Sequence, residues 1–267
     1  MSNRQDGAKK DGRLAGVLAL DVGNTTTRLG FFASGELAGT WEVTTPARLT
    51  ADEAFAQVKQ ALAMLELEEP ADSIMACVVP SHAAPWGEAL SRLCGGRPLT
   101  VGPGLKTGVR MRFDDPSQIG ADRISDVVAA RERYGAPVVV VDLGTTTNFE
   151  VVDAEGTFVG GIIAPGMGMG AQALTRGTAK LPMVELRAPA AVMGRSTDAA
   201  MRSGIVLGEV ARIEGLLSMI SYELGCEAPV VLTGDDAQAM SALLSCEVAV
   251  DDTLTLRGLY SIWRRNR

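Results

Sequence analysis

The sequence predicts an α/β protein with a duplicated fold, and two observations lead to this prediction. Apolar runs typical of buried strands alternate with amphipathic segments typical of helices along the 267 residues. In addition, one strand–turn–strand pattern occurs twice, as VLALDVGNTTTRLGFF at residues 17–32 and as VVVVDLGTTTNFEVV at residues 138–152. In both copies the apolar run ends at an aspartate, and Asp142 follows Asp21 by 121 positions. A repeat of this length indicates two similar halves.

Each copy predicts a β-hairpin whose tip is suited to hold phosphate. A glycine follows two positions after each aspartate, Gly23 in the first copy and Gly144 in the second, and hydroxyl-bearing residues come next. Backbone N–H groups, hydroxyls and a carboxylate are what a phosphate chain and its metal ion require. For a single copy, an aspartate that merely caps the turn is the better interpretation. Two copies favour a nucleotide held by both halves, and the chain contains no P-loop sequence GxxxxGK[ST].

The first half continues with alternating strands and helices. Thr50 is expected to open an amphipathic helix, and the Asp115-Pro116 turn leads into another helix that begins near Gly120. The expected elements are, in order, a strand at 35–43, a helix from Thr50 and Asp52 to Pro70, a strand within 73–82, a short helix at 85–94, a glycine-broken strand region at 98–111, and a helix from Gly120 to Gly135.

The second half repeats this order. After the hairpin we expect a strand that runs into a Gly/Pro turn at Pro165-Gly166, followed by a helix. Either Ser196 or Thr197 is expected to cap a long helix. The remaining elements are a loop at 187–198, the long helix at 198–225, a strand within 229–237, a short segment at 248–250 and a last helix at 256–266.

Composition excludes several classes of function. A net charge of −7 and a pI near 4.9 argue against nucleic acid as the main partner. No apolar run is long enough to span a membrane. The four cysteines form no CxxC pair, and His82, expected at a turn or on the surface, is the only histidine, so neither a zinc site nor a histidine triad is predicted. Sparse cysteines in apolar stretches are typical of buried, reduced thiols, which predicts a cytoplasmic protein.

The segment GADR, residues 120–123, is the candidate for proton transfer. Gly120 allows a close approach of the backbone, and Asp122 and Arg123 fall in the first turn of the expected helix. An alcohol that attacks phosphorus needs orientation and a proton acceptor, which an aspartate can provide. Taken alone, a salt bridge at a helix N-terminus is the better interpretation; beside two phosphate hairpins, catalysis is favoured.

Five segments, in this order, resemble the type III pantothenate kinases: DVGNTTTRLG, GADR, DLGTTT, GGIIAPG and RSTDAAMRSG. The resemblance extends from residue 17 to about residue 263. It implies membership in the superfamily of acetate kinases, sugar kinases, heat-shock chaperones and actin, with two ribonuclease-H-like halves (the actin-like ATPase fold) and a nucleotide cleft between them. We therefore expect a flexible tail at residues 1–15, one half at 16–125 and the other at 126–267.

The resemblance also implies roles for individual residues. Asp122 is the general base toward the hydroxyl of pantothenate. Asp21 organises Mg²⁺ through water, and Asp142 seats a monovalent cation, K⁺ or NH₄⁺. Contacts to ATP are implied for Asp21, Gly23, Asn24, Thr25, Arg28, Gly144, Thr145 and Thr146, and contacts to pantothenate for Phe113, Gly120, Ala121, Asp122, Arg123 and Thr197. The family is dimeric, so a homodimer is expected, with pantothenate and ATP as its small-molecule partners.

Several positions depart from the family pattern. Arg28 stands where lysine is usual, and Phe113 replaces a tyrosine that would add a hydroxyl contact. Near the second hairpin and the expected adenosine pocket, the departures are Asn148, Glu150 and the pair Gly234-Asp235. Two alternatives therefore stay open beside pantothenate phosphorylation, namely a kinase for a sugar or carboxylate and a nucleotide-binding regulator without turnover.

Overall fold

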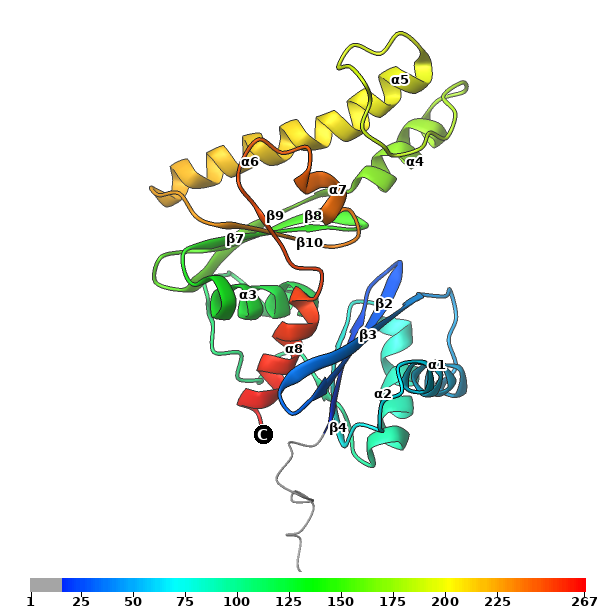
Figure 1. The fold of residues 1–267 in the computed structure, drawn as a ribbon. Helices are drawn as coiled ribbons and strands as arrows, with labels where there is room; N and C mark the ends of the chain where they lie inside the picture. Colours follow the sequence, from blue (N-terminus) through cyan, green and yellow to red (C-terminus); the bar gives the residue numbers. More distant parts are fainter. Residues whose placement is uncertain (1–15) are drawn as a thin grey trace, which may run out of the picture. The chain divides into compact units, whose positions relative to one another are not determined.

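The computed structural model describes residues 16–267, which divide into two compact units (Figure 1). The first unit contains the chain up to Gly108, then Ser117–Val128 and Thr255–Arg267, whereas the second contains Val109–Pro116 and Ala129–Leu254. The expected tail at residues 1–15 lies outside the described residues. The predicted halves, 16–125 and 126–267, follow the sequence repeat and stay a prediction.

The first unit is built on a five-stranded sheet in the order β3-β2-β1-β4-β5. β1 pairs antiparallel with β2, which pairs antiparallel with β3, while β4 lies parallel to β1 and β5 parallel to β4. The strands are β1 (Val17–Val22), β2 (Thr26–Ala33), β3 (Glu36–Thr44), β4 (Asp72–Cys77) and β5 (Leu99–Thr100).

Helices cover both faces of this sheet. Alternate residues of a strand point to opposite faces, so neighbouring residues contact different helices. Phe31 packs in the core with α1 and α2, whereas the ring of its neighbour Phe32 stacks on Tyr260 of α8 at 4.2 Å. Thr50 caps α1 in a reciprocal capping box with Glu53, as its sequence predicts. The helices of this unit are α1 (Ala51–Met64), α2 (Pro80–Cys94), the start of α3 (Ala121–Tyr134), which follows the 3₁₀ turn η1 (Pro116–Gln118), and nearly all of α8 (Leu254–Arg265).

The second unit has a six-stranded sheet in the order β11-β10-β7-β8-β9-β6. β7, β8 and β9 form an antiparallel meander, and β10 and β11 extend the sheet in parallel from β7. The strands are β6 (Arg110–Met111), β7 (Val138–Leu143), β8 (Thr146–Val152), β9 (Thr157–Pro165), β10 (Val230–Thr233) and β11 (Ala249–Val250).

The two sheets share one topology. The order 3-2-1-4-5 of the first sheet reappears as 9-8-7-10-11 in the second, with the same parallel and antiparallel neighbours, and only β6 is added. The connections match as well, because a helix follows the last strand of each set, α3 after β5 and α8 after β11. The predicted duplicated α/β fold is confirmed.

Helices of the second unit pack on one face of its sheet around a core that includes Phe149, Ile213 and Leu232. The long helix expected at 198–225 is divided by a five-residue π-helical segment, and Ser196 is its N-cap. The helices are α4 (Met167–Gly177), α5 (Thr197–Arg202), the π segment η2 (Ser203–Leu207), α6 (Gly208–Leu224) and α7 (Ala237–Ser241). Among the described residues, no helix combines the length and apolar character needed to cross a bilayer.

Three local expectations need correction. Helix α2 begins at Pro80 rather than at Pro85, because a proline is tolerated at the first helical position. This start places His82 inside the helix with only 2% of its surface exposed, not at a turn or on the surface. The cysteines are less buried than expected, since Cys77 and Cys94 are half-buried and Cys226 and Cys246 are exposed; all four are free thiols.

Candidate active site

The first hairpin has a tight tip of three residues, Gly23 to Thr25. The N–H of Gly23 donates to the carbonyl of Thr26 at 3.0 Å, and the strand ladder places Asp21 opposite Arg28. Asn24 and Thr25 are exposed, whereas Asp21 is half-buried at the carboxyl end of β1. The tip thus presents an amide and a hydroxyl to solvent beside a carboxylate, which are the groups that a phosphate–metal site uses.

Thr45, which follows β3, holds this tip in place, although sequence reasoning did not single it out. Its N–H donates to the carbonyl of Thr25 at 2.8 Å, and its hydroxyl donates to the carbonyl of Gly23 at 2.8 Å. The same hydroxyl lies 2.9 Å from that of the buried Thr27. Two hydrogen bonds from Thr45 thus fix the tip, and the third contact fixes Thr45 itself to β2.

Arg28, the predicted phosphate-binding cation, is paired with a carboxylate of the next strand. Its Nε lies 2.9 Å from Oε2 of Glu42, and 57% of the Glu42 side chain is exposed. An exposed ion pair of this kind contributes only about 0–1 kcal/mol. The pair directs the guanidinium toward the neighbouring strand β3.

Cys77 ends the strand beside β1, where the strand ladder sets it opposite Val22. Burial raises the pKa of its thiol, and the negative charge of the nearby Asp21 raises this pKa further. A backbone hydrogen bond at Val79 acts in the opposite direction and lowers this pKa. The protonated thiol donates to the carbonyl of Val79 at 3.1 Å. Cys77 is accordingly a neutral neighbour of Asp21 rather than a nucleophile.

The second hairpin repeats the geometry of the first. The N–H of Gly144 donates to the carbonyl of Thr146 at 3.1 Å, which matches the Gly23–Thr26 contact, and Asp142 lies opposite Asn148 in the ladder. Beyond β9, the N–H of Gly166 donates to the carbonyl of Thr145 at 3.2 Å. Gly166 is also the N-cap of α4 and offers no side-chain cap, so the N-terminal amides of this helix lie next to the tip.

A second acidic element borders this hairpin. Gly234 directly follows β10 and has a φ of +93°, and a Cβ atom at this position would lie 2.5 Å from Oδ1 of Asp142. The backbone N–H of Asp236 donates to the carbonyl of Leu143 at 3.0 Å. Burial raises the pKa of Asp236, and the charges of Asp235 and Glu209 raise this pKa further. The departure at Asp235 thus adds negative charge beside the second hairpin.

The predicted general base lies at the start of α3, within the first unit. Oδ1 of Asp122 accepts from the N–H of Arg123 at 2.8 Å, which orients the carboxylate, and both side chains are half-buried. The N–H of Ile124 donates to the carbonyl of Gly120 at 3.1 Å, so the helical hydrogen bonds begin at the GADR segment.

Helix α8 anchors this part of α3. The hydroxyl of Thr255 donates to Oδ1 of the buried Asp126 at 2.6 Å. At Gly258 the two helices come so close that a Cβ atom would meet the backbone of Ser125. The position of Asp122 therefore depends on a helix more than 130 residues later in the sequence.

Phe113 and Thr197, the other two predicted contacts of pantothenate, belong to the second unit. The Phe113 ring packs edge-on against the buried Phe158, with ring centroids 4.8 Å apart. Thr197 is the exposed first residue of α5, directly after its cap. The Asp21 hairpin and the GADR segment thus belong to the first unit, whereas the Asp142 hairpin, Phe113 and Thr197 belong to the second.

Sequence comparison places these features in a known group of proteins. The profile of the type III pantothenate kinase family matches residues 17–219. The type III pantothenate kinase of Moorella thermoacetica is 41% identical over 253 residues, which cover 94% of this chain and 99% of that protein. That of Brevibacillus brevis is 40% identical over 257 residues with the same coverage.

This chain belongs to the type III pantothenate kinase family.

Solved structures agree with the fold of this family member. A Baf family transcriptional activator from Campylobacter jejuni has a TM-score of 0.57 at 19% identity, covering 93% of this chain and 98% of its own. Component A of the (R)-2-hydroxyglutaryl-CoA dehydratase of Acidaminococcus fermentans has a TM-score of 0.55 at 14% identity, covering 95% of this chain and all of its own. These likenesses support the actin-like ATPase fold predicted for the family, with a duplicated ribonuclease-H-like sheet.

The donor atoms of this family member suit the expected ions. Around both hairpin tips they are oxygens of carboxylates, hydroxyls and carbonyls, which Mg²⁺ and K⁺ prefer over nitrogen or sulfur. Within residues 16–267 no group of three or more His, Cys, Asp or Glu side chains is arranged around a metal position. A Mg²⁺ held by one carboxylate, water and nucleotide phosphates requires no such group, so the residues fit it.

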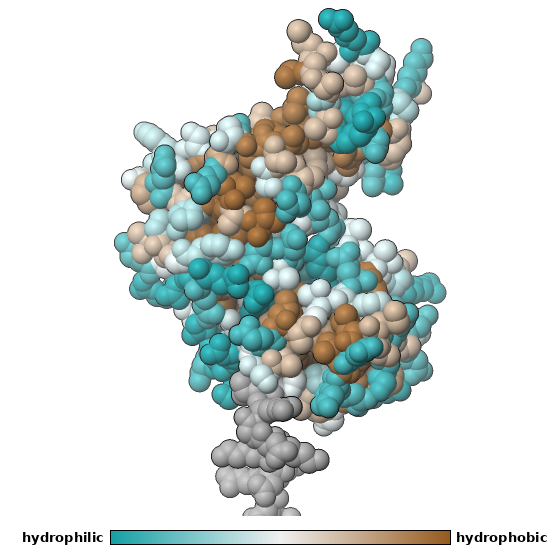
Figure 2. Space-filling model, viewed as in Figure 1, coloured by the Kyte–Doolittle hydropathy of each residue, from teal (hydrophilic) through white to brown (hydrophobic). Residues whose placement is uncertain are grey.

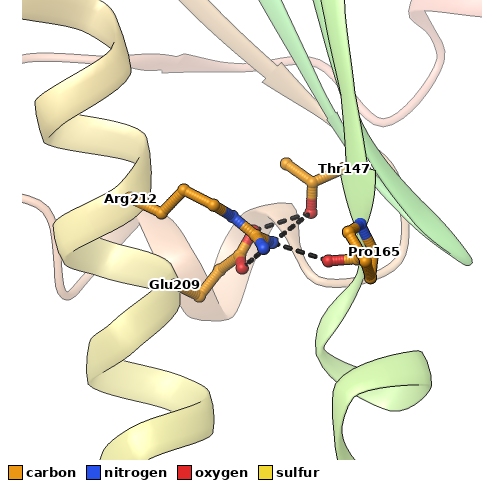
Figure 3. A network of polar contacts seen from close by, with 4 residues as sticks. All are labelled: Thr147, Pro165, Glu209 and Arg212. Atoms are coloured by element: carbon orange, nitrogen blue, oxygen red, sulfur yellow. Dashed lines mark hydrogen bonds and ion pairs between the residues drawn. The ribbon is translucent and has the colours of Figure 1, made fainter. Parts of the chain in front are cut away.

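Sequence reasoning missed one partly buried polar network in the second unit of this kinase family member. It joins Thr147 on β8 and Pro165 on β9 to Glu209 and Arg212 on α6 (Figure 3). A glutamate and an arginine three residues apart on an amphipathic helix are typical of a solvated surface pair, so this spacing offers no reason to assign them a role.

Proposed function

We propose that this protein transfers the γ-phosphate of ATP to the primary hydroxyl of pantothenate, which yields 4'-phosphopantothenate in the first step of coenzyme A biosynthesis. The observation that carries this proposal is the 41% identity to a type III pantothenate kinase over 94% of the chain. The two hairpins and the GADR segment supply the groups that this reaction requires.

In the proposed reaction, Asp122 accepts the proton of the pantothenate hydroxyl while the hydroxyl oxygen bonds to the γ-phosphorus and the bond to ADP breaks. The hydrogen bond from the Arg123 N–H supports this role because it orients the carboxylate. General bases typically contribute a factor of about 10²–10⁴, and positioning and charge neutralisation contribute the rest. We assign further contacts with pantothenate to Gly120, Ala121, Arg123, Phe113 and Thr197.

The phosphates of ATP are assigned to both hairpin tips, with Gly23, Asn24, Thr25 and Arg28 in the first unit and Gly144, Thr145 and Thr146 in the second. Asp21 is proposed to hold the water shell of Mg²⁺, which when bound neutralises charge on the phosphates. Asp142 is proposed to seat K⁺ or NH₄⁺. Its acidic surroundings at Asp235 and Asp236 favour a cation there.

The protein is further proposed to act as a homodimer through the outer face of α6 and the segment before it. Gly204, Gly208 and Gly215 are exposed there with open space around them, and Met219 and Tyr222 continue the face with 67% and 91% of their surfaces exposed. Figure 2 shows apolar residues gathered along the course of α6 in this view. Glycines permit close approach of a second helix, and large exposed apolar side chains are typical of interfaces.

Light scattering tests the dimer. Gly215→Arg places a long charged side chain on this face and should yield a monomer, whereas the matched variant Gly177→Arg, at the exposed end of α4, should stay dimeric. A dimer that persists in the Gly215 variant would exclude this face. A cytoplasmic location is proposed as well, and the four free thiols support it because a reducing compartment keeps thiols unpaired.

One assay decides the proposed activity. ADP production is measured with ATP, Mg²⁺ and K⁺ in the presence of pantothenate, of a panel of sugars, or of small carboxylates. Turnover with pantothenate alone is the expected result. Turnover with another acceptor would favour a different kinase, and calorimetric binding of ATP without turnover on any acceptor would favour a nucleotide-binding regulator.

A further inference from the structure

Thr147 is the last of the three consecutive threonines in the second hairpin, and its hydroxyl does not face the exposed tip. Successive residues of a strand point to opposite faces, so Thr147 points toward the helices that cover the sheet. Its surface is 1% exposed, and its hydroxyl donates to Oε1 of Glu209 at 2.7 Å (Figure 3). Thr147 therefore connects the hairpin with α6 and makes no contact with solvent.

Glu209 is a charged residue in an apolar core, with 4% of its surface exposed. A buried carboxylate costs several kcal/mol unless it is paired and hydrogen-bonded. Arg212, one turn later on α6, forms an ion pair with its Oε2. The two oxygens of Glu209 are thus divided between the hairpin and the arginine, which fixes the orientation of the carboxylate.

Arg212 also reaches a third chain segment. Its Nη2 donates to the carbonyl of Pro165 at 2.6 Å and lies 3.5 Å from the hydroxyl of Thr147. Pro165 is the ladder partner of Thr146 and directly precedes Gly166, whose N–H holds the carbonyl of Thr145. One guanidinium therefore holds the ends of β8 and β9 where the tip and the start of α4 meet.

The π-helical segment Ser203–Leu207 ends two residues before Glu209. A π turn inserts an extra residue and rotates the subsequent residues relative to a regular helix, and such segments occur frequently at functional sites. In this chain it leaves Gly204 and Gly208 exposed, while Glu209 enters the core next to the second hairpin.

We propose that Glu209 and Arg212 are positioning residues that hold the tip Gly144–Thr146 and the first amides of α4 in the arrangement that binds ATP phosphates. The pair acts through Thr147 and Pro165 and touches no substrate. This inference rests on the proposed function, because it assigns to the second tip a contact with ATP. Its consequence is selective: loss of the pair weakens ATP binding and leaves the affinity for pantothenate unchanged.

The test compares variants that remove the hydrogen bonds with variants that preserve them. Thr147→Val keeps the shape but removes the hydroxyl, and Thr147→Ser restores it. Arg212→Met removes the guanidinium. Arg212→Lys keeps the charge on a side chain one bond shorter than the one whose Nη2 contacts both Glu209 and Pro165, so these contacts should lengthen. Arg187→Met is the matched control, because Arg187 forms an exposed ion pair with Glu185 in the same unit.

Dissociation constants for ATP are measured by calorimetry, and KM for ATP and for pantothenate by the kinase assay. Thr147→Val and Arg212→Met should weaken ATP binding about tenfold, which corresponds to ~1.4 kcal/mol. Thr147→Ser and Arg187→Met should stay within about twofold of the wild type, as should every KM for pantothenate. Should the Val or Met variant fail to fold, Arg212→Lys decides, with ATP affinity expected to fall and thermal stability nearly unchanged.

Three results would each overturn the inference. The first is a loss of thermal stability without a change in ATP affinity, which is what a purely structural network predicts. The second is an equal loss of affinity for ATP and pantothenate, and the third is a Thr147→Ser variant that binds ATP as weakly as Thr147→Val. A failure of the proposed function can be told apart from a failure of this inference. If the wild type binds ATP but does not phosphorylate pantothenate, the ATP affinities of the variants can still be compared by calorimetry. A wild type that does not bind ATP would overturn both.

Discussion

Gly234→Ala tests the packing around Asp142 directly. With a φ of +93°, Gly234 lies in the left-handed region, where any other L-residue is strained by about 1–2 kcal/mol. The added Cβ would lie 2.5 Å from Oδ1 of Asp142 and 2.6 Å from the carbonyl oxygen of Leu143, against 3.4 Å for ordinary contact. Leu143 cannot retreat freely, because its carbonyl accepts from the N–H of Asp236. Overpacking adds about 1–3 kcal/mol, so we expect a total loss of ~2–5 kcal/mol.

The position of the tryptophans makes the assay specific to one unit. All three of them, Trp41, Trp86 and Trp263, lie in the first unit, so tryptophan fluorescence reports on that unit, whereas far-UV circular dichroism reports on both. In urea, the dichroism midpoint of Gly234→Ala should fall by about 1–2 M for a slope of ~2–3 kcal/mol per M. The fluorescence midpoint should fall less.

Gly177→Ala is the matched control, because Gly177 is exposed at the end of α4 with open space around it. Its stability should change by less than about 1 kcal/mol. The kinase assay adds a second readout for the proposed K⁺ site at Asp142. The K⁺ concentration that gives half-maximal activity should rise in Gly234→Ala, because the added methyl group displaces the carboxylate of Asp142. If both unfolding midpoints of Gly234→Ala stay at the wild-type values, the close approach of β10 to Asp142 is wrong.

Three further predictions address other parts of the site. Asp122→Asn should lower turnover by about 10²–10⁴ while calorimetric ATP binding is retained, and full activity would remove Asp122 from the mechanism. Thr45→Val should weaken ATP binding and lower the free energy of unfolding by about 1–2 kcal/mol, because the hydrogen bonds of the Thr45 hydroxyl to Gly23 and Thr27 are lost. Thr45→Ser should restore both ATP binding and stability, and a Ser variant as weak as the Val variant would contradict this explanation. Burial raises the pKa of Asp236 above its ordinary value of 3.8. The stability that its protonated form contributes is therefore complete below pH 3.8 and is lost as the pH rises through the raised pKa. At neutral pH, Asp236→Asn should be more stable than the wild type by under about 1 kcal/mol, because the group is half-exposed, and near pH 3.8 the two should be equally stable. Urea titrations at both pH values measure this, and an Asn variant that is less stable at neutral pH would refute it.

The repeated fold could be predicted because its information is local. A run such as Val138–Val141 followed by an aspartate and a glycine determines a buried strand and its turn, and the structure has the hairpin at these residues. Thr50 and Glu53 predict the start of α1 by the same kind of local rule. Assignments to ATP, pantothenate and cations rest on family resemblance, and they stay predictions.

Features that depend on distant partners could not be predicted. The hydrogen bond between Thr255 and Asp126 joins residues 129 positions apart, and nothing near either residue indicates it. Glu209 and Arg212 have the spacing of a surface pair, yet the sheet packed against α6 buries the glutamate. The burial of His82 has the same kind of cause. The Pro80-Ser81 dipeptide before it is typical of a turn, but in the structure it forms the first turn of α2, and the packing of this helix buries His82.

Helix α8 has a consequence for the order in which the protein is made. Thr255–Arg267 belongs to the first unit, where Nε1 of Trp263 donates to Oδ2 of Asp72 at 3.0 Å and Arg267 forms an ion pair with the same carboxylate. During synthesis, the ribosome produces the whole of the second unit before it produces this helix. The sheet of the first unit is translated earliest, yet this unit is complete only after α8 has been synthesised. The contacts that support Asp122, the aspartate assigned as general base, can therefore form only when translation has passed residue 258.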